Sequence, residues 1–424
     1  MLDRRRHWIP PAALCAGQAA HAISWGLLLI LAARRPFVLG LPALAWLHLV
    51  ALGWLTMTAL AVLVHVIPTF TEVPWKGERM ARGSLLLYGV GVVALVTAFW
   101  SNSVAALPWA GSLIALALVG YLIPAGRTLA AAFTRARREA AIARALSITL
   151  TSLFIAALIG VGLALALAGR GPALLLSYAP PIHASFGIIG WLTVLIMGVS
   201  TQTIRPIAGA SSRYPAAHIC AGALEIVGLV ATGVGVGFHL PILSWIGMFD
   251  LLLGAIVYVG DLADVLRRAT VAHRPPQAFL GAGAVWLVAG LALSAGLLAG
   301  APWGAAAAYV LVIGWLGQMV NGHLYHIGIR LIATMARGDD DETQPYELLV
   351  LPLSWGSYAL FQAAIAAGGF ALMFGQTQFL VAVACAGFAG WIAMFANVVI
   401  AALRAKQQGP PKSPVTISLL RRAT

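Results

Sequence analysis

The sequence is poor in charged residues, and above all in acidic ones. Only 9% of its 424 residues are charged, with 13 Asp and Glu against 26 Lys and Arg, while 61% are hydrophobic. A soluble domain carries about a quarter charged residues, so this composition excludes a soluble globular protein. Long apolar runs take the place of the missing charge. They predict a polytopic membrane protein that contacts the lipid bilayer over most of its length.

Cysteine is also scarce. The chain has three, Cys15, Cys220 and Cys385, all inside apolar segments and in neither a CxxC nor a CxxCH pattern. A disulfide framework and covalent haem attachment are therefore excluded. The three cysteines are predicted to be small core residues.

Twelve membrane-spanning helices are predicted, which makes the fold class all-α. The first apolar run is longer than the hydrophobic region of a signal peptide, so it is interpreted as a retained span. The predicted spans lie near residues 10–33, 41–67, 84–101, 108–129, 145–169, 178–204, 216–238, 241–263, 277–299, 303–334, 346–372 and 377–403.

The net charge of +13 does not indicate nucleic-acid binding, because the basic residues form short clusters between apolar runs. These clusters fall on alternate connections, and the opposite connections carry only Arg34, Arg35 and Arg170. Cytoplasmic loops are enriched in Lys and Arg, so both termini are predicted to be cytoplasmic. The acidic patch 339–342 is interpreted as a solvated loop. Residues 407–424 are interpreted as a cytoplasmic tail, disordered or lying on the anionic inner leaflet.

One short string occurs three times, as Gly53-Trp54-Leu55, Gly190-Trp191-Leu192 and Gly314-Trp315-Leu316. The copies are 137 and 124 residues apart, which is the size of a four-helix unit rather than of a solenoid repeat. The chain is therefore predicted to be a single transmembrane domain of three related units, near residues 1–138, 139–274 and 275–406. Twelve residues after its Gly, each copy has a polar side chain: His65, Gln202 and His326.

Histidines occur at two depths on the spans that carry the string. His48 and His183 lie five and seven residues before their Gly, near the predicted outer ends. His65, His323 and His326 lie near the inner ends. From His48 to His65 is about 25 Å of helix, so the two levels cannot share one metal ion.

Imidazole is a common ligand of haem iron and of copper, and a bis-His haem needs two imidazoles from different helices. His48 and His183 are predicted to be such a pair, because they occupy nearly equivalent positions on equivalent helices. A single histidine within a span can instead form a hydrogen bond to a neighbouring helix. For the inner group of His65, His323 and His326, a cofactor site and helix-end hydrogen bonding both stay open.

The chain resembles subunit I of the haem–copper oxidases. The resemblance rests on His48-Leu49-Val50-Ala51-Leu52-Gly53-Trp54, on His183-Ala184-Ser185-Phe186-Gly187-Ile188-Ile189-Gly190-Trp191 and on Leu324-Tyr325-His326. It is greatest to the cbb3-type branch and its smaller relatives, including the NO-response proteins called NnrS. The resemblance implies haem b at the outer ends of spans 2, 6 and 10, and copper as a further candidate cofactor. It also implies a cytochrome or other respiratory subunit as partner, and the inner membrane of a bacterium as location.

The chain departs from that family at two places. Where the family's tenth span carries two haem-binding histidines, this sequence has Ala307 and Tyr309. Tyr309 is interpreted as an interfacial aromatic residue rather than as an axial ligand. Where the seventh span of an oxidase supplies an adjacent His pair to copper, this one has only His218 and His239. The usual binuclear centre is therefore not recognisable, although His239 and His183 lie on the same predicted side.

Other polar residues lie within the predicted spans. His21, Glu225 and Asp250 are candidates for a proton or ion path, because hydrocarbon penalises unpartnered charge. Asp261 and Asp264 lie beside Arg267 and Arg268, where surface salt bridges are the expected role.

Two functions follow. The first is a haem-binding relative of oxidase subunit I that serves electron transfer or handles a diatomic gas such as NO or O2. If it is an enzyme, it is then an oxidoreductase acting on O2 or NO. The second is a transporter or metal-handling permease, with the buried His, Glu and Asp lining its pathway.

Overall fold

The computed structural model describes residues 9–34, 40–135, 137–337 and 345–408. Within these residues the chain forms twelve helical segments that are long and apolar enough to cross a membrane. They are numbered here as spans 1 to 12 in chain order, and the prediction of an all-α fold with twelve spans is confirmed. The basic residues Arg4 to Arg6, the acidic patch 339–342 and most of the predicted tail lie outside the described residues.

Nine spans are essentially one helix each. They are α1 (Ile9–Ala33), α4 (Glu78–Trp100), α5 (Leu107–Ala132), α6 (Arg137–Leu167), α9 (Pro215–Gly237), α10 (Pro241–Arg267), α11 (Pro275–Leu298), α15 (Leu351–Met373) and α16 (Leu380–Gln408). Short 3₁₀ turns η3 (Val104–Ala106), η7 (Pro345–Leu348) and η8 (Thr377–Phe379) precede α5, α15 and α16. Spans 3 and 5 begin about two turns earlier than the apolar pattern predicts, because helices continue past the hydrocarbon region into polar sequence.

Spans 2, 6 and 10 are the three that change helix type midway. Span 2 is α2 (Leu41–His48), the π-helical η2 (Leu49–Thr56) and α3 (Met57–Thr71). Span 6 is α7 (Leu175–Ser185), the π-helical η4 (Phe186–Thr193) and α8 (Val194–Ala208). Span 10 is α12 (Gly304–Tyr309), the π-helical η5 (Val310–Gly317), α13 (Gln318–His323), the π-helical η6 (Leu324–Gly328) and α14 (Ile329–Arg337). Each repeated string therefore lies in a π-helical segment that starts four residues before its Gly and ends three after it.

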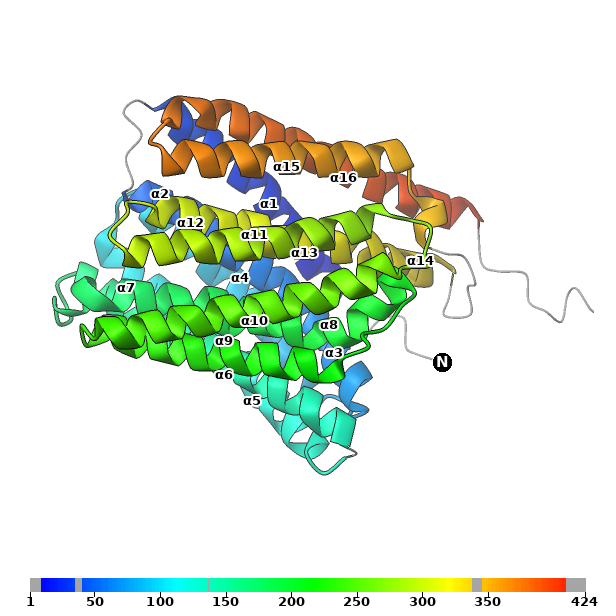
Figure 1. Ribbon diagram of the computed structural model, residues 1–424, viewed down its shortest axis with the longest axis horizontal. Helices are drawn as coiled ribbons and strands as arrows, with labels where there is room; N and C mark the ends of the chain where they lie inside the picture. The colour runs from blue at the N-terminus through cyan, green and yellow to red at the C-terminus, as the bar shows by residue number, and fades with distance from the viewer. Residues whose placement is uncertain (1–8, 35–39, 136, 338–344, 409–424) are drawn as a thin grey trace, which may run out of the picture.

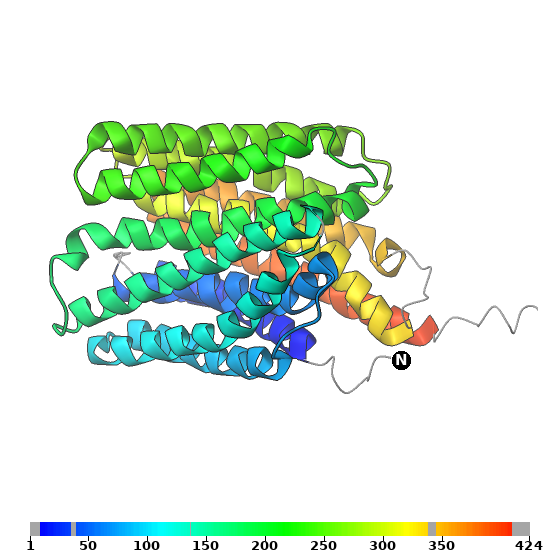
Figure 2. The same ribbon diagram turned by 90° about the horizontal axis from the view of Figure 1, so that it is seen from below.

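The spans run side by side along one direction in both views of the molecule (Figures 1 and 2). Spans 2 and 10 occupy the middle of the bundle. The buried share of the most apolar stretch is 72% in span 2 and 78% in span 10, whereas it is 33 to 44% in the other spans. The residues on these two spans are therefore shielded from lipid, so their polar side chains need partners within the protein.

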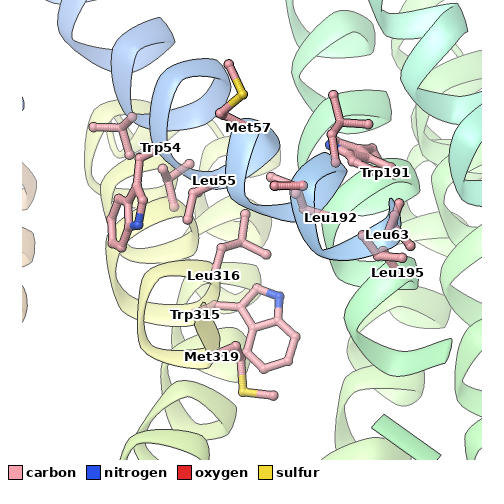
Figure 3. Packing of buried hydrophobic residues seen from close by; sticks show 14 of the residues in the cluster. Trp54, Leu55, Met57, Leu63, Trp191, Leu192, Leu195, Trp315, Leu316 and Met319 are labelled. Atoms are coloured by element: carbon pink, nitrogen blue, oxygen red, sulfur yellow. The ribbon is translucent and has the colours of Figure 1, made fainter. Parts of the chain in front are cut away.

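The three tryptophans of the repeated string are buried around Leu55, Leu192 and Leu316 of the same strings (Figure 3). The Nε1–H of Trp191 donates to Oγ1 of Thr56 at 3.1 Å, and that of Trp315 donates to Oγ1 of Thr193 at 2.9 Å. Both threonines directly follow the Leu of a string. At the same position the third copy has Gly317, and a Cβ there would lie 2.9 Å from the ring of Trp54. The hydrogen bond that links one string to the next is thus made twice. The grouping of the whole chain into three four-helix units stays a prediction.

The prediction for the cysteines is wrong in part. All three are free thiols, as expected, but Cys15, Cys220 and Cys385 are exposed on the outside of the bundle. An apolar run shows that a residue lies within a span, yet it does not show which side of the helix faces the neighbours.

Candidate functional site

His48 and His183 come together although they are 135 positions apart in the sequence. Their ring centres are 6.2 Å apart and their planes differ by 22°. His48 is the last residue of α2, directly before the π-helical η2. His183 lies in α7, three residues before the π-helical η4. Of the histidines predicted to bind a cofactor at the outer level, the structure brings these two together.

Both imidazoles are held by the same ring nitrogen. Nδ1 of His48 lies 2.8 Å from the carbonyl oxygen of Leu44, and Nδ1 of His183 lies 2.9 Å from that of Ala156. A carbonyl only accepts, so Nδ1 carries the proton in each ring and donates it. The lone pair is then on Nε2. A metal-binding histidine is typically fixed in this way, with one nitrogen held by a backbone carbonyl and the other left as the donor.

The surroundings fix the orientation of both rings. The ring of His48 lies 4.9 Å from that of Phe99 on α4, with an angle of 29° between the planes. His183 packs against Gly160 on α6, where a Cβ would come within 3.0 Å of Cε1 of the imidazole. The absence of a side chain at position 160 therefore makes room for His183. Nothing in the sequence around Gly160 marks it as part of a site, and the sequence reading missed it.

Two apolar cavities flank the histidine pair. One, of about 410 Å³, is lined by Leu44, Trp46 and Leu47 of α2 together with Tyr309 of α12. The other, of about 390 Å³, is lined by Ile182 and Phe186 of span 6 and by part of α9. Each cavity is lined by sequence neighbours of the two histidines and by neither imidazole.

The interpretation of Tyr309 as an interfacial residue is wrong. Its side chain is only 1% exposed, and its hydroxyl donates to the carbonyl oxygen of Ala364 at 3.0 Å. Its ring lies 6.1 Å from that of Trp46, with an angle of 18° between the planes. Position near a helix end suggested an interface, but α12 turns this residue inward. The hydroxyl is committed to the backbone, so Tyr309 is a packed residue of the bundle.

The donor set fits a group held by two imidazoles. With metal–nitrogen distances of about 2.0 Å, two imidazoles on opposite sides of one ion have ring centres roughly 6 Å apart, and here they are 6.2 Å apart. Among the described residues, no group of three or more His, Cys, Asp or Glu side chains forms that could hold a metal ion. His239 is exposed, in the turn between α9 and α10 at a φ of 56°. The two histidines alone therefore provide the candidate ligands at this level.

The inner histidines have different roles in the structure. Nδ1 of His323 donates to the carbonyl of Met319 at 2.7 Å, so its Nε2 accepts from Oγ1 of Thr203 at 2.9 Å. Both nitrogens of His323 are thus used, and the bond to Thr203 joins span 10 to span 6. His326 is half-buried, and His65 is exposed on α3 with its ring 3.5 Å from Oγ1 of Thr69. For His323 the hydrogen-bonding alternative describes what is observed.

A buried His–Asp pair lies between α9 and α10. Nε2 of His218 is 2.7 Å from Oδ2 of Asp261, and Oγ of Ser212 donates to Oδ1 of Asp261 at 2.6 Å. The expected surface salt bridge is correct for Asp264, which pairs with Arg268 at 2.6 Å. For Asp261 it is wrong, because this carboxylate is 5% exposed. A seam of small residues joins the two helices so closely that a Cβ on Gly228 would lie 2.7 Å from the carbonyl of Gly247. Asp261 lies in that seam, and Asp264, three residues later, lies outside it.

Two of the three path candidates are completely buried. Glu225 is 0% exposed, and both its carboxylate oxygens are without a hydrogen-bond partner in the described part of the chain. It faces α10 at Gly254, where a Cβ would lie 3.3 Å from Oε1. His21 is 0% exposed as well, with both ring nitrogens unpartnered among the described residues. Asp250 is half-buried on α10. The assignment of a proton or ion path to these residues remains a prediction.

Comparison with known proteins gives a fold. No family model and no curated protein matches the sequence. The chain is similar to a solved structure described as a heme-copper terminal oxidase dimer, with a TM-score of 0.69 over 93% of this chain and 82% of that one. The chain has the haem–copper oxidase fold. The two sequences are 12% identical, so the similarity establishes the fold alone, as the resemblance implied.

Proposed function

We propose that this chain is a membrane-bound haem protein in which His48 and His183 would hold the haem iron. The observation that supports this most directly is the matched geometry of the pair. Two imidazoles from different spans lie 6.2 Å apart, each with Nδ1 held by a carbonyl and its Nε2 lone pair available. Haem b is the expected group, since no CxxCH motif is present for covalent attachment.

Electron transfer is the role that two axial histidines support best. Haem iron supplies reversible one-electron chemistry when bound. If both histidines held the haem iron, NO or O2 would have to compete with one of them or bind at copper nearby. The chain's own residues orient the imidazoles, through the carbonyls of Leu44 and Ala156 and through contacts with Phe99 and Gly160. A cytochrome or another respiratory subunit in the bacterial inner membrane is the corresponding electron donor. Within the haem–copper oxidase superfamily, the chain is then a small relative of the NnrS-like subtype.

One observation favours the transporter alternative. Glu225 is a completely buried carboxyl without a hydrogen-bond partner in the described residues, on a helix packed closely against α10. Ionisable residues inside spans commonly line ion or proton pathways. On this view the His–Asp pair at the end of the same seam is the entrance, and the histidines of spans 2 and 6 are packing residues.

An absorption spectrum distinguishes the two functions. The detergent-purified protein is measured oxidised and then after reduction with dithionite, and the same sample is analysed for iron and copper. The haem proposal predicts a Soret band with sharp, low-spin reduced bands and about one iron per chain. Copper bound without iron would point to a metal-handling protein. Absence of both, in protein supplied with haem during expression, would leave the transporter.

A further inference from the structure

Among the described residues, nine of the 18 buried side-chain atoms that lack a hydrogen-bond partner belong to seven side chains on three spans. Spans 1, 2 and 10 carry a group of such atoms, each buried and without a hydrogen-bond partner among the described residues. We call their seven side chains the central polar cluster: Gln18, His21, Trp25, Trp54, Thr58, Gln318 and Asn321. Buried polar groups are nearly always hydrogen-bonded, either within the protein or to ordered water. So many unpartnered atoms in one place indicate a bound molecule.

His21 is at the middle of this cluster. Its ring stacks on Trp54, with ring centres 3.4 Å apart and an angle of 7°, and it stacks on Phe361 of α15 at 5.6 Å. Trp54 thus covers one face of the imidazole, and the two ring nitrogens lie at its edge.

The other members of the cluster surround the same aromatic rings. A Cβ on Gly317 would lie 2.9 Å from the ring of Trp54, which places span 10 against this tryptophan at the residue before Gln318. A Cβ on Gly17 would lie 2.6 Å from Oγ1 of Thr58, which places α1 against span 2. Gln362, next to Phe361, donates from Nε2 to Oε1 of Gln318 at 2.7 Å. Nε2 of Gln318 stays without a partner in the described residues.

Four equally buried tryptophans differ in their hydrogen bonding, and this difference distinguishes the central polar cluster from the rest of the core. Trp25, Trp54, Trp191 and Trp315 are each no more than 1% exposed. The indole N–H groups of Trp191 and Trp315 donate to threonines, whereas those of Trp25 and Trp54 have no partner in the described part of the chain. Burial alone therefore does not explain the unpartnered groups. The difference depends on which side of the bundle the indole faces.

A buried polar column connects the cluster to the end of the bundle where α1 begins and α16 ends, on the right in Figure 1. At that end Nδ2 of Asn397 donates to Oγ of Ser354 at 2.9 Å. Further in, the hydroxyls of Tyr325 and Ser357 lie 2.8 Å apart. Asn321 comes one turn before Tyr325 on span 10, with both amide atoms unpartnered among the described residues. Asn397, Ser354, Ser357 and Asn321 are all 0% exposed.

The chemistry of the unpartnered atoms identifies the class of ligand. The indoles and the Gln318 amide offer donors, Gln18 offers an acceptor, and His21, Thr58 and Asn321 offer both. A cation needs acceptors and an anion needs donors, so the mixed set matches neither. None of the seven side chains is a carboxylate, Lys or Arg. Water, which donates and accepts and forms about three hydrogen bonds at a buried site, matches the set.

We propose that ordered water molecules fill the central polar cluster and continue along the polar column, so that His21 is in hydrogen-bonded contact with the end of the bundle where α1 begins and α16 ends. This site is separate from the histidine pair and does not depend on its occupancy. It gives the imidazole of His21, the titratable group at the inner end of the column, a route for exchanging protons across the apolar core.

Radiolytic hydroxyl-radical labelling tests the proposal. X-rays produce radicals from water in place, so a buried side chain is oxidised only where water lies beside it. The full-length protein in nanodiscs is exposed, digested and analysed by mass spectrometry. We expect oxidation of Trp25 and Trp54 to exceed that of Trp191 and Trp315 several-fold, although all four are equally buried. Equal protection of the four tryptophans would overturn the proposal.

Two substitutions refine the test. Asn321→Leu removes two polar atoms with little change in volume, and Thr58→Val removes one hydroxyl while keeping its shape. Each is expected to lower the labelling of Trp54 and to leave Trp191 and Trp315 unchanged. A rise at all four tryptophans in Asn321→Leu would show loss of the fold, and Thr58→Val, the milder change, then decides. Unchanged labelling of Trp54 in a folded Thr58→Val protein would contradict a water cluster that contacts both residues.

Discussion

The ring of His48 lies 6.2 Å from the ring of His183 although the two residues are not at the same register. His48 comes five residues before its repeated Gly, and His183 comes seven before. The same offset recurs between Tyr309, five before its Gly, and Trp46, seven before, whose rings are 6.1 Å apart. A residue five before the Gly on one span thus meets a residue seven before it on a neighbouring span. The histidine pair uses a packing relationship that the bundle also makes between other side chains.

Gly160 is expected to be necessary for the position of His183. In Gly160→Val the new side chain would displace the imidazole, because even a Cβ would lie 3.0 Å from Cε1. The variant should insert normally and bind less haem. Gly162→Val, on the same helix, is the matched control, since its Cβ would lie 3.5 Å from Leu175 and is not near the ring. Haem per chain in the two purified variants checks this. Equal haem content would show that Gly160 does not position the ligand.

The carboxylates of α10 should differ in their effect on stability. Asp261→Asn breaks a buried pair with His218 and is expected to cost about 3 kcal/mol. Asp264→Asn removes a partly exposed pair with Arg268 and should cost much less, because solvent screens the two charges. The two sites are three residues apart on one helix. Unfolding in mixed detergent micelles measures the difference, and similar costs for both would contradict the burial of Asp261.

The hydrogen bonds between tryptophan and threonine should couple spans 2, 6 and 10. A double-mutant cycle of Trp315→Phe and Thr193→Val is expected to give a coupling of about 0.6 kcal/mol, typical of interhelical hydrogen bonds in membranes. The same cycle for Trp54→Phe and Thr193→Val should give none, because no hydrogen bond joins these residues. A coupling of equal size in both cycles would mean that the effect comes from packing.

His273 should make stability depend on pH. It lies outside the spans, its ring is 5.7 Å from that of Tyr346, and burial lowers its pKa from 6.5 to about 4. The folded protein therefore favours the neutral imidazole. Its contribution is complete above pH 6.5 and is lost progressively as the pH falls from 6.5 towards 4. His273→Gln should reduce the fall in Tm between pH 7.5 and pH 5. A pH profile identical to that of the unsubstituted protein would exclude His273 as the cause.

The twelve spans could be predicted from the sequence, and His48 and His183 could be selected from it as a candidate pair. Long apolar runs predict twelve spans because hydrocarbon admits little else, and the repeated string brought His48 and His183 into consideration together. Neither signal reports which way a helix faces. Tyr309 was assigned to an interface and the three cysteines to the core for that reason, and both assignments were wrong.

Other features depend on the packing between helices, which can be related to residue spacing only once the structure is known. Asp261 appeared to be a surface residue because Arg267 and Arg268 follow it. Its burial comes from Gly228, Gly247 and Gly254, which let α9 and α10 approach until their backbones touch. The available signal was a pair of glycines seven residues apart on each helix, Gly228 and Gly235 on α9 and Gly247 and Gly254 on α10. Each π-helical segment surrounds a copy of the repeated string, but Gly, Trp and Leu do not by themselves predict a π-helix.

The amount of haem bound per chain tests the central claim most directly. It is measured as the pyridine haemochrome of purified protein, for the unsubstituted chain and for His48→Ala, His183→Ala and His239→Ala. We expect about one haem per chain in the unsubstituted protein, a large loss in His48→Ala and in His183→Ala, and full occupancy in His239→Ala, whose histidine is exposed. Full haem occupancy in both His48→Ala and His183→Ala would contradict the assignment of this pair as the ligands.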